Sequence, residues 1–132
     1  DLTGTILTDA DLTEANLTGV DLSGKDLTGT ILTGADLSGV NLSNAILINV
    51  NLENATLENA NLVDTNLASA NLSNADLRNT LLVDTNLSNT TLTGSDLTGA
   101  VLTGAILTGA DLENAVLTNA ILNCVGHPVC IS

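Results

Sequence analysis

The sequence predicts an all-β solenoid, a chain that winds as a coil around one narrow core. A leucine occupies every fifth position from Leu2 to Leu122, which makes 25 leucines in one register. The column two residues before the leucines holds almost only small or β-branched side chains. The column two residues after them is rich in Gly, Asn and Asp, the residues that form turns. Together the three columns describe one short structural unit that repeats along the chain.

The spacing of the leucines is incompatible with a regular helix or a flat strand. Five residues turn an α-helix by about 500°, or 140° net, so the leucines would be scattered around its surface. In a flat strand, leucines five residues apart would point to opposite faces in turn. A chain that bends by a fixed angle in every repeat points all of them toward a common axis.

The column before the leucines predicts a second set of inward positions. Its 24 positions, from 5 to 120, hold 13 Ala, 6 Thr, 3 Val and 1 Ser, and the exception is Lys25. Such uniformly small side chains indicate a crowded site next to the core. Burying a lysine there is costly. Two interpretations stay open: a local bulge that lets Lys25 reach solvent, or a positive spot for a ligand or partner.

The column after the leucines predicts a turn in every repeat. Among its 25 positions are 10 Gly, 9 Asn and 3 Asp, which tolerate a positive φ. Each repeat is therefore a short extended piece followed by a turn. The residues that flank the leucine are mostly Asp or Asn before it and Thr or Ser after it, and we expect both to face solvent.

The repeats resemble those of the pentapeptide-repeat family, whose pattern is A(D/N)LXX. Examples are ADLTE at 10–14, ANLTG at 15–19, ANLVD at 60–64 and ADLEN at 110–114, and the resemblance covers about residues 1–124. It implies a right-handed quadrilateral parallel β-helix in which four repeats make one four-sided coil of 20 residues. About six such coils, with ladders about 4.8 Å apart, give a rod roughly 30 Å long.

The chain divides into a β-helix at 1–123 and a C-terminal cap segment at 124–132. The repeat AILNC loses its turn residue at Cys124, and Pro128 cannot continue a ladder. We see no linker and no second domain.

The two cysteines, Cys124 and Cys130, flank a short loop in this cap. A disulfide between them would stabilise the cap by roughly 2–3 kcal/mol in the chain-entropy picture. Two reduced thiols are an alternative, and so is a metal site with His127, which would lack a fourth ligand. A disulfide favours an oxidising compartment such as the periplasm, the thylakoid lumen or the exterior. Without it we expect a cytoplasmic protein.

The composition argues against several classes of partner. The net charge is −13, with 15 acidic residues against Lys25 and Arg78, so almost nothing is present to neutralise the phosphates of a nucleic acid. This charge is consistent with a solvated acidic exterior and could attract a basic protein surface. No run of about 18 apolar residues exists, so we expect no membrane insertion.

One face of the predicted coil carries apolar side chains where the repeat expects polar ones. With a 20-residue coil, the face centred on Leu62, Leu82 and Leu102 collects Val63, Leu81, Val83, Val101 and Ile121. A contiguous exposed apolar stripe is the usual sign of an interface, either with an unknown protein partner or in a homodimer. Alternatively, these residues only favour the ladder and have no partner.

The sequence contains few residues that could carry out catalysis. It has one histidine and neither a nucleophile elbow nor a Gly-rich phosphate loop. The carboxylates stand at ordinary repeat positions, with no cleft to perturb their pKa. We therefore expect no enzyme, no catalytic residue, no cofactor and no metal.

These observations favour a non-enzymatic structural or protein-interaction scaffold. Many members of the similar family, abundant in cyanobacteria and thylakoid lumens, have no known biochemical role. The resemblance implies one alternative, a DNA-mimicking inhibitor of a type II topoisomerase such as DNA gyrase, which the charge of −13 would suit. The resemblance also implies that such mimics place Phe at some central positions, form longer rods and dimerise through a C-terminal helix. Against this alternative, the present chain has no Phe, only about six coils and no amphipathic helical tail.

Overall fold

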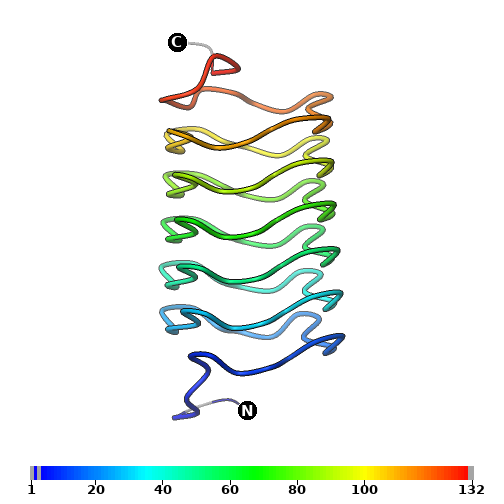
Figure 1. The fold of residues 1–132 in the computed structure, drawn as a ribbon, viewed down its shortest axis with the longest axis vertical. Helices are drawn as coiled ribbons and strands as arrows, with labels where there is room; N and C mark the ends of the chain where they lie inside the picture. The colour runs from blue at the N-terminus through cyan, green and yellow to red at the C-terminus, as the bar shows by residue number, and fades with distance from the viewer. Residues whose placement is uncertain (1, 3, 131–132) are drawn as a thin grey trace.

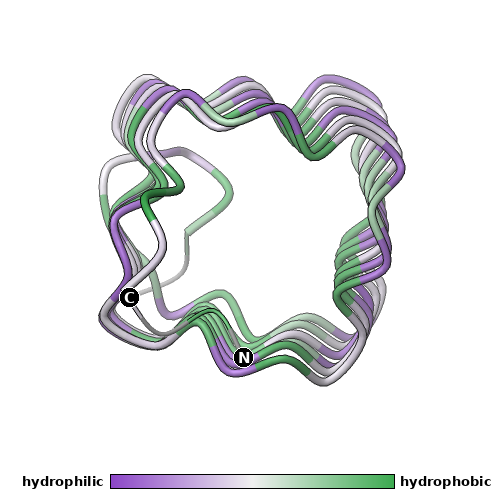
Figure 2. Ribbon diagram, turned by 90° about the horizontal axis from the view of Figure 1, so that it is seen from below, coloured by the Kyte–Doolittle hydropathy of each residue, from purple (hydrophilic) through white to green (hydrophobic). Residues whose placement is uncertain are grey.

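The computed structural model describes residue 2 and residues 4–130, which wind into a four-sided stack of coils (Figures 1 and 2). Within these residues there is no helix, and no strand is longer than a single paired residue. The pairs are parallel and join residues 20 apart, from Asp11–Ile31 to Val101–Ile121. The coil of four repeats that the sequence predicts is therefore present.

Backbone hydrogen bonds between coils hold the stack together. In a typical repeat, the Leu72 amide donates to the Thr91 carbonyl (2.7 Å), and the Thr91 amide donates back to Ala70 (3.0 Å). The turn residue also bonds to the next coil, Asn74 to Thr93 (2.9 Å). Residues 20 apart therefore lie directly above one another, and we call each such set a ladder column.

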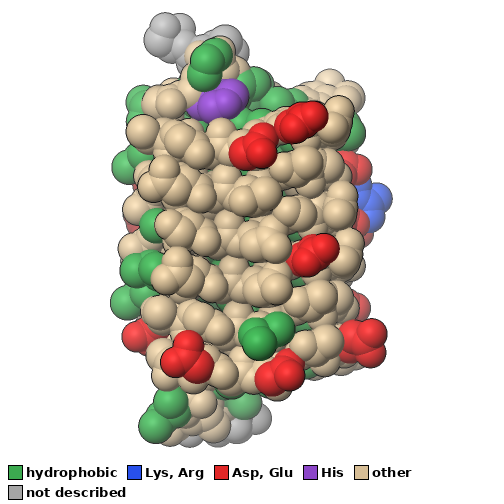
Figure 3. Space-filling view, in the orientation of Figure 1, with side chains coloured by type: hydrophobic (Ala, Val, Ile, Leu, Met, Phe, Trp, Pro, Cys, Tyr) green, Lys and Arg blue, Asp and Glu red, His purple; other side chains and the backbone are tan. Residues whose placement is uncertain are grey.

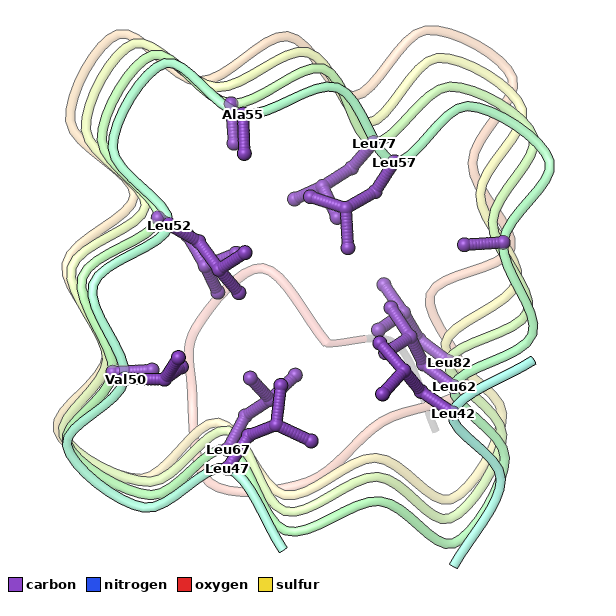
Figure 4. Close-up of a cluster of buried hydrophobic side chains, with 14 of the residues drawn as sticks. Leu42, Leu47, Val50, Leu52, Ala55, Leu57, Leu62, Leu67, Leu77 and Leu82 are labelled. Atoms are coloured by element: carbon purple, nitrogen blue, oxygen red, sulfur yellow. The ribbon is translucent and has the colours of Figure 1, made fainter. Parts of the chain in front are cut away.

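The leucines point inward and form a continuous core (Figure 4). Every leucine of the five-residue register from Leu22 to Leu107 is at most 1% exposed, whereas Leu12 and Leu112, nearer the ends, are partly exposed. The small column fills the space between them, as Val50 and Ala55 do in Figure 4. Each coil is thus buried chiefly by its neighbours, as in other solenoids.

Hydroxyl side chains in the small column satisfy leucine carbonyls. The buried Thr65 donates to the carbonyl of Leu42 in the previous coil (2.8 Å), and the buried Thr80 donates to that of Leu77 in the preceding repeat of its own coil (2.7 Å). Thr30, Thr85, Thr90 and Ser95 bond in one of these two ways. Because a buried hydroxyl without a partner is costly, these bonds explain why Thr and Ser are tolerated beside the core.

Every turn position from Gly4 to Asn119 has a positive φ, as the sequence predicts. The φ of Gly34 is 66° and that of Asn54 is 58°. Each turn is closed by a bond from the residue three places after the leucine to the leucine carbonyl, as from Ala55 to Leu52 (3.0 Å). A positive φ at the third residue is the signature of a type II β-turn. Gly-rich and Asn-rich repeats therefore use the same left-handed backbone.

The register shortens by one residue at Cys124. Ile106 pairs with Val125, 19 residues on, so Cys124 takes the place above Ala105 in the small column and is 6% exposed. Gly126 follows with a φ of 86°, and an added Cβ there would lie 2.9 Å from the Thr108 nitrogen. The chain then turns inward across the end of the core (Figure 2). Val129 and Cys130 pack against the core residues.

Residue 2 and residues 4–130 contain no helix with the length and hydropathy that a bilayer span requires.

The cost of shortening a leucine should depend on its coil. Leu72 and Leu112 stand in one ladder column, but only Leu72 is completely buried. We expect Leu72→Ala to lower the free energy of unfolding by about 3 kcal/mol, because it leaves a cavity in a fixed frame. Leu112→Ala should cost about a third of that. Urea unfolding followed by circular dichroism measures both, and equal losses would contradict a core built from interior coils.

Candidate protein-interaction surface

The five apolar residues that the sequence singles out lie together on one face. Leu81, Val101 and Ile121 stack in one ladder column, and Leu81 and Ile121 are 42% and 47% exposed. Val63 and Val83 are half-buried in the neighbouring column, one coil apart. A bond from the Asp64 amide to the Val83 carbonyl (3.0 Å) joins their coils. We call these five residues the apolar face.

The two edges of the apolar face differ in charge. The turn column that follows Val63 and Val83 supplies the exposed Asp64 and Asp84. The turn column on the other edge is neutral and consists of Asn59, Asn79, Gly99 and Asn119. The apolar face is therefore bordered by carboxylates on one side only.

Further apolar side chains lie around the corner beyond the acidic edge. Ile106 and Val125 pair with one another and are 40% and 55% exposed. The sequence analysis missed this pair because a 20-residue coil does not align the two residues. Ile106 and Val125 are neighbours only because the register shortens by one residue at Cys124.

The rod is not uniformly apolar. Figure 3 shows a face on which carboxylates are scattered among neutral side chains and few hydrophobic ones, with more hydrophobic side chains along its left edge. Ile31, in a column with Asp11 and Asn51, is 39% exposed and has polar neighbours above and below. The described residues contain no pocket. Binding through a docked surface suits this shape better than binding in a cavity.

Arg78 is engaged by two carboxylates of the rod. Its guanidinium donates to both oxygens of Asp76 (2.8 and 2.6 Å) and to Glu58 one coil below (3.2 Å). The hydrogen bond from Arg78 holds the pKa of Asp76 below its usual range. The same contact with Asp76 raises the pKa of Arg78 further above its ordinary value. Arg78 is therefore paired with carboxylates of its own face of the rod.

Lys25 does not lie in a bulge, and that expectation is wrong. Its backbone keeps the regular bonds, donating to Leu22 (3.1 Å) and accepting from Ile46 (2.9 Å). The partly buried side chain donates from Nζ to the carbonyl of Leu2 (2.9 Å), 23 residues earlier. Thr65 bonds to Leu42 across the same 23 residues. Lys25 thus satisfies a leucine carbonyl of the first coil, and no ligand is needed to explain it.

The Asp or Asn before each leucine has a role that the sequence analysis missed. From Asp11 to Asp111, every Asp or Asn at this position accepts a hydrogen bond from the backbone amide two residues on. The acceptors are Asp11, Asn16, Asp21, Asp26, Asp36, Asn41, Asn51, Asn61, Asn66, Asn71, Asp76, Asn86, Asp96 and Asp111. This Asx turn supplies a partner to the one amide of the repeat that neither the ladder nor the β-turn bonds. The signal in the sequence was an Asp or Asn directly before the leucine, whose side chain can reach the backbone amide of the residue directly after the leucine.

Four of these carboxylates also accept a hydrogen bond from the hydroxyl two residues on, and one of the four is Asp96, which accepts from Thr98 (2.6 Å). Thr13, Thr28 and Ser38 each donate their hydroxyl at 2.6 Å to the aspartate two residues before. The hydroxyl bond, followed by the backbone amide bond, lowers the pKa of Asp11, Asp26 and Asp36 below its ordinary value. All three belong to the exposed surface.

The cap brings the two cysteines to bonding distance. The Sγ atoms of Cys124 and Cys130 are 2.03 Å apart. The Nδ1 atom of His127 accepts a hydrogen bond from the Val129 amide (3.1 Å). Both sulfurs and this ring nitrogen are therefore used within the cap, in place of the cysteine–histidine metal site considered from the sequence. The described residues hold no group of His, Cys, Asp and Glu suited to a metal.

The fold defines a four-sided parallel β-solenoid whose faces are single-residue ladders. The chain belongs to the pentapeptide repeat family. The family model described as "Pentapeptide repeats" matches in eight copies, over residues 1–34, 35–73, 45–82, 60–99, 70–109 and 95–125. A comparison with curated proteins found no match.

Solved structures of the same kind are similar to this chain. A pentapeptide repeat protein from the Arabidopsis thaliana thylakoid lumen is 31% identical, with a TM-score of 0.73 over 74% of this chain and 68% of that one. The pentapeptide repeat protein Rfr23 from the cyanobacterium Cyanothece 51142 is 32% identical, with a TM-score of 0.52 over 89% and 91%. QnrB1, a plasmid-mediated fluoroquinolone resistance protein, is 19% identical, with a TM-score of 0.47 over 89% and 73%.

The lowered pKa values predict how acid affects the fold. A carboxyl whose pKa is depressed by folding stabilises the fold above its unfolded pKa of about 3.9, and that contribution is lost as the pH falls through the folded pKa. Replacing Asp11, Asp26 and Asp36 together by Asn keeps the amide-to-oxygen bonds, as Asn16 shows, but removes the titration. Between pH 5 and pH 2, we expect the melting temperature of the triple variant to rise relative to the wild type.

The control is the triple variant Glu14→Gln, Glu53→Gln and Glu113→Gln. It removes the same charge from residues that make no such turn bond. Thermal melts followed by circular dichroism compare the three proteins. If the melting temperature of the wild type fell below those of the two variants by the same amount in acid, overall charge and not the Asx turns would set the pH dependence of stability.

Proposed function

We propose that this protein is a non-enzymatic scaffold that docks a protein partner on its apolar face. The observation that carries the proposal is the stacking of five apolar side chains in two adjacent ladder columns, with Leu81 and Ile121 more than two-fifths exposed. Exposed apolar patches bordered by polar residues are typical of interaction sites.

The ladder makes this surface suitable for recognition without rearrangement. Its backbone is bonded to both adjacent coils: the Leu81 amide donates to Ala60 in the coil below (3.0 Å), and the Leu82 amide donates to Val101 in the coil above (2.8 Å). Side chains on such a frame are already in place before a partner arrives. Binding therefore loses less conformational freedom than it would on a flexible loop.

The proposal includes an oxidising compartment and a right-handed coil. The pairing of Cys124 with Cys130 favours a location in the periplasm or the thylakoid lumen, and one similar structure comes from the thylakoid lumen of Arabidopsis thaliana. Right-handed winding is implied by the family resemblance and is the usual hand of connections between parallel strands.

A DNA-mimicking inhibitor of DNA gyrase is the alternative. The net charge of −13 favours it. Against it, the carboxylates are scattered over several faces, with Asp11 and Glu113 on one face and Asp64 on another. Arg78 also neutralises part of the charge of Glu58 and Asp76. The apolar face, moreover, would have no use on a mimic of a charged duplex.

Partner enrichment should depend on the apolar face. The tagged protein is incubated with extract of its source cells, and bound proteins are quantified by mass spectrometry. The variant Leu81→Lys/Val83→Lys places two charges on the apolar face. The control Ile31→Lys/Thr33→Lys places them at equivalent positions of another face. We expect a protein enriched by the wild type to fall at least about tenfold with the first variant, since burying lysines is costly, and to persist with the control.

Two results would contradict the proposed function. One is equal enrichment of every bound protein by the wild type and both variants, because the apolar face would then be unused. The other is inhibition of gyrase supercoiling by the wild-type protein at micromolar concentration, which would favour the DNA-mimic alternative. Circular dichroism confirms beforehand that each variant keeps the wild-type fold.

A further inference from the structure

The border of the apolar face leaves two carboxylates without a counter-charge. Among the described residues, Asp64 and Asp84 take part in no ion pair, and their side chains accept no hydrogen bond. Arg78 is held by Asp76 and Glu58. The ammonium of Lys25 donates to the Leu2 carbonyl. Because these are the only Lys and Arg residues of the sequence, neither cation of the described residues neutralises the acidic edge, which is open to the basic groups of a partner.

A second copy of this chain is a poor occupant of the apolar face. It would bring another net charge of −13, and its own Lys25 and Arg78 would be engaged in the same way. Like charges at the rim of an interface oppose association. A partner with basic residues next to an apolar surface complements both parts of the site.

The backbone of the apolar face excludes one common mode of recognition. The amide of Leu82 bonds to Val101, and the amide of Val101 bonds to Thr80 (2.8 and 3.0 Å). Since these groups are already paired within the ladder, a partner strand cannot add to this face through main-chain bonds. The partner has to bind through side chains, as an amphipathic helix does in a hydrophobic groove or on a hydrophobic surface.

The dimensions of the apolar face fit a short helix laid along the rod. From the coil of Val63 to that of Ile121 there are three ladder steps, or about 14 Å at about 4.8 Å a step. About ten helical residues span this length at 1.5 Å each. Helical side chains three or four residues apart recur about every 5.4 Å, close to the ladder spacing.

We infer that the apolar face binds an amphipathic α-helix of a partner protein, about ten residues long, with Lys or Arg along one flank. This rests on the proposed function and names the chemistry of its partner. The apolar side of the helix lies on Leu81, Val101 and Ile121 and on the two valines beside them. Its basic flank lies along Asp64 and Asp84, and its other flank faces the neutral edge of Asn59, Asn79 and Asn119.

Dye-labelled peptides of about 14 residues test this directly, with fluorescence anisotropy as the readout. One peptide carries a leucine stripe and lysines on one flank, a second has glutamates in place of the lysines, and a third has the lysine composition in scrambled order. We expect the wild-type protein to bind the first peptide best. Asp64→Asn/Asp84→Asn should weaken that binding by about fivefold, as expected for two exposed charge pairs.

The matched control is Glu53→Gln/Glu113→Gln, which removes two charges from another face. It should change the affinity less than about twofold, since screening weakens charges more than about 10 Å away. Asn already occupies the turn column at Asn44, so the aspartate substitutions suit the local backbone. Equal losses in the two variants, or equal binding of the scrambled peptide, would overturn the inference and leave only diffuse attraction.

The inference and the proposed function fail in different ways. If the source-cell partner needs Leu81 and Val83 but neither the lysine nor the glutamate peptide binds the apolar face, the proposed function stands and the helical, basic occupant is wrong. Sedimentation velocity of the protein alone adds a further check. A dimer that Leu81→Lys dissociates would overturn the inference in favour of a second copy.

Discussion

The structure depends on backbone hydrogen bonds that keep residues 20 apart in register. In the repeats of the interior coils, the amides of the leucine, of the residue before it and of the turn residue bond to an adjacent coil, as those of Leu72, Thr91 and Asn74 do. Every side chain then sits directly above its counterpart in the previous coil. The core of leucines, the small column beside it and the surface columns all follow from this register. Function therefore has to be sought in columns and not in single residues.

The sequence predicted the architecture because each column has one dominant physical requirement. Leucines had to share an axis, small residues had to fit beside them, and turn residues had to accept a positive φ. The five members of the apolar face could be predicted for the same reason, since the 20-residue coil alone aligns Leu81 with Val101 and Ile121. A regular solenoid converts position in the sequence into position in space more directly than a globular fold does.

Features that depend on a second partner could not be predicted in this way. The Asp or Asn before each leucine is polar and exposed, which solvent alone explains, so its bond to the amide two residues on was overlooked. Lys25 breaks the size rule, but its contact with the Leu2 carbonyl arises only because it lies one coil above the end of the stack. The loss of the turn residue at Cys124 is visible in the sequence, but the five-residue period does not predict that the ladder continues after it and pairs Ile106 with Val125.

The central claim is that a five-residue pattern of hydrogen bonds underlies both the rod and the alignment of its apolar face. Hydrogen exchange resolved by residue with NMR tests it most directly. The amides of Leu72 and Asn74, bonded to the next coil, should exchange at least about tenfold more slowly than that of Ser73, bonded only to the Asn71 side chain. The same pattern should recur every five residues through the interior coils. Protection that is uniform along the chain, or that follows another period, would contradict the account.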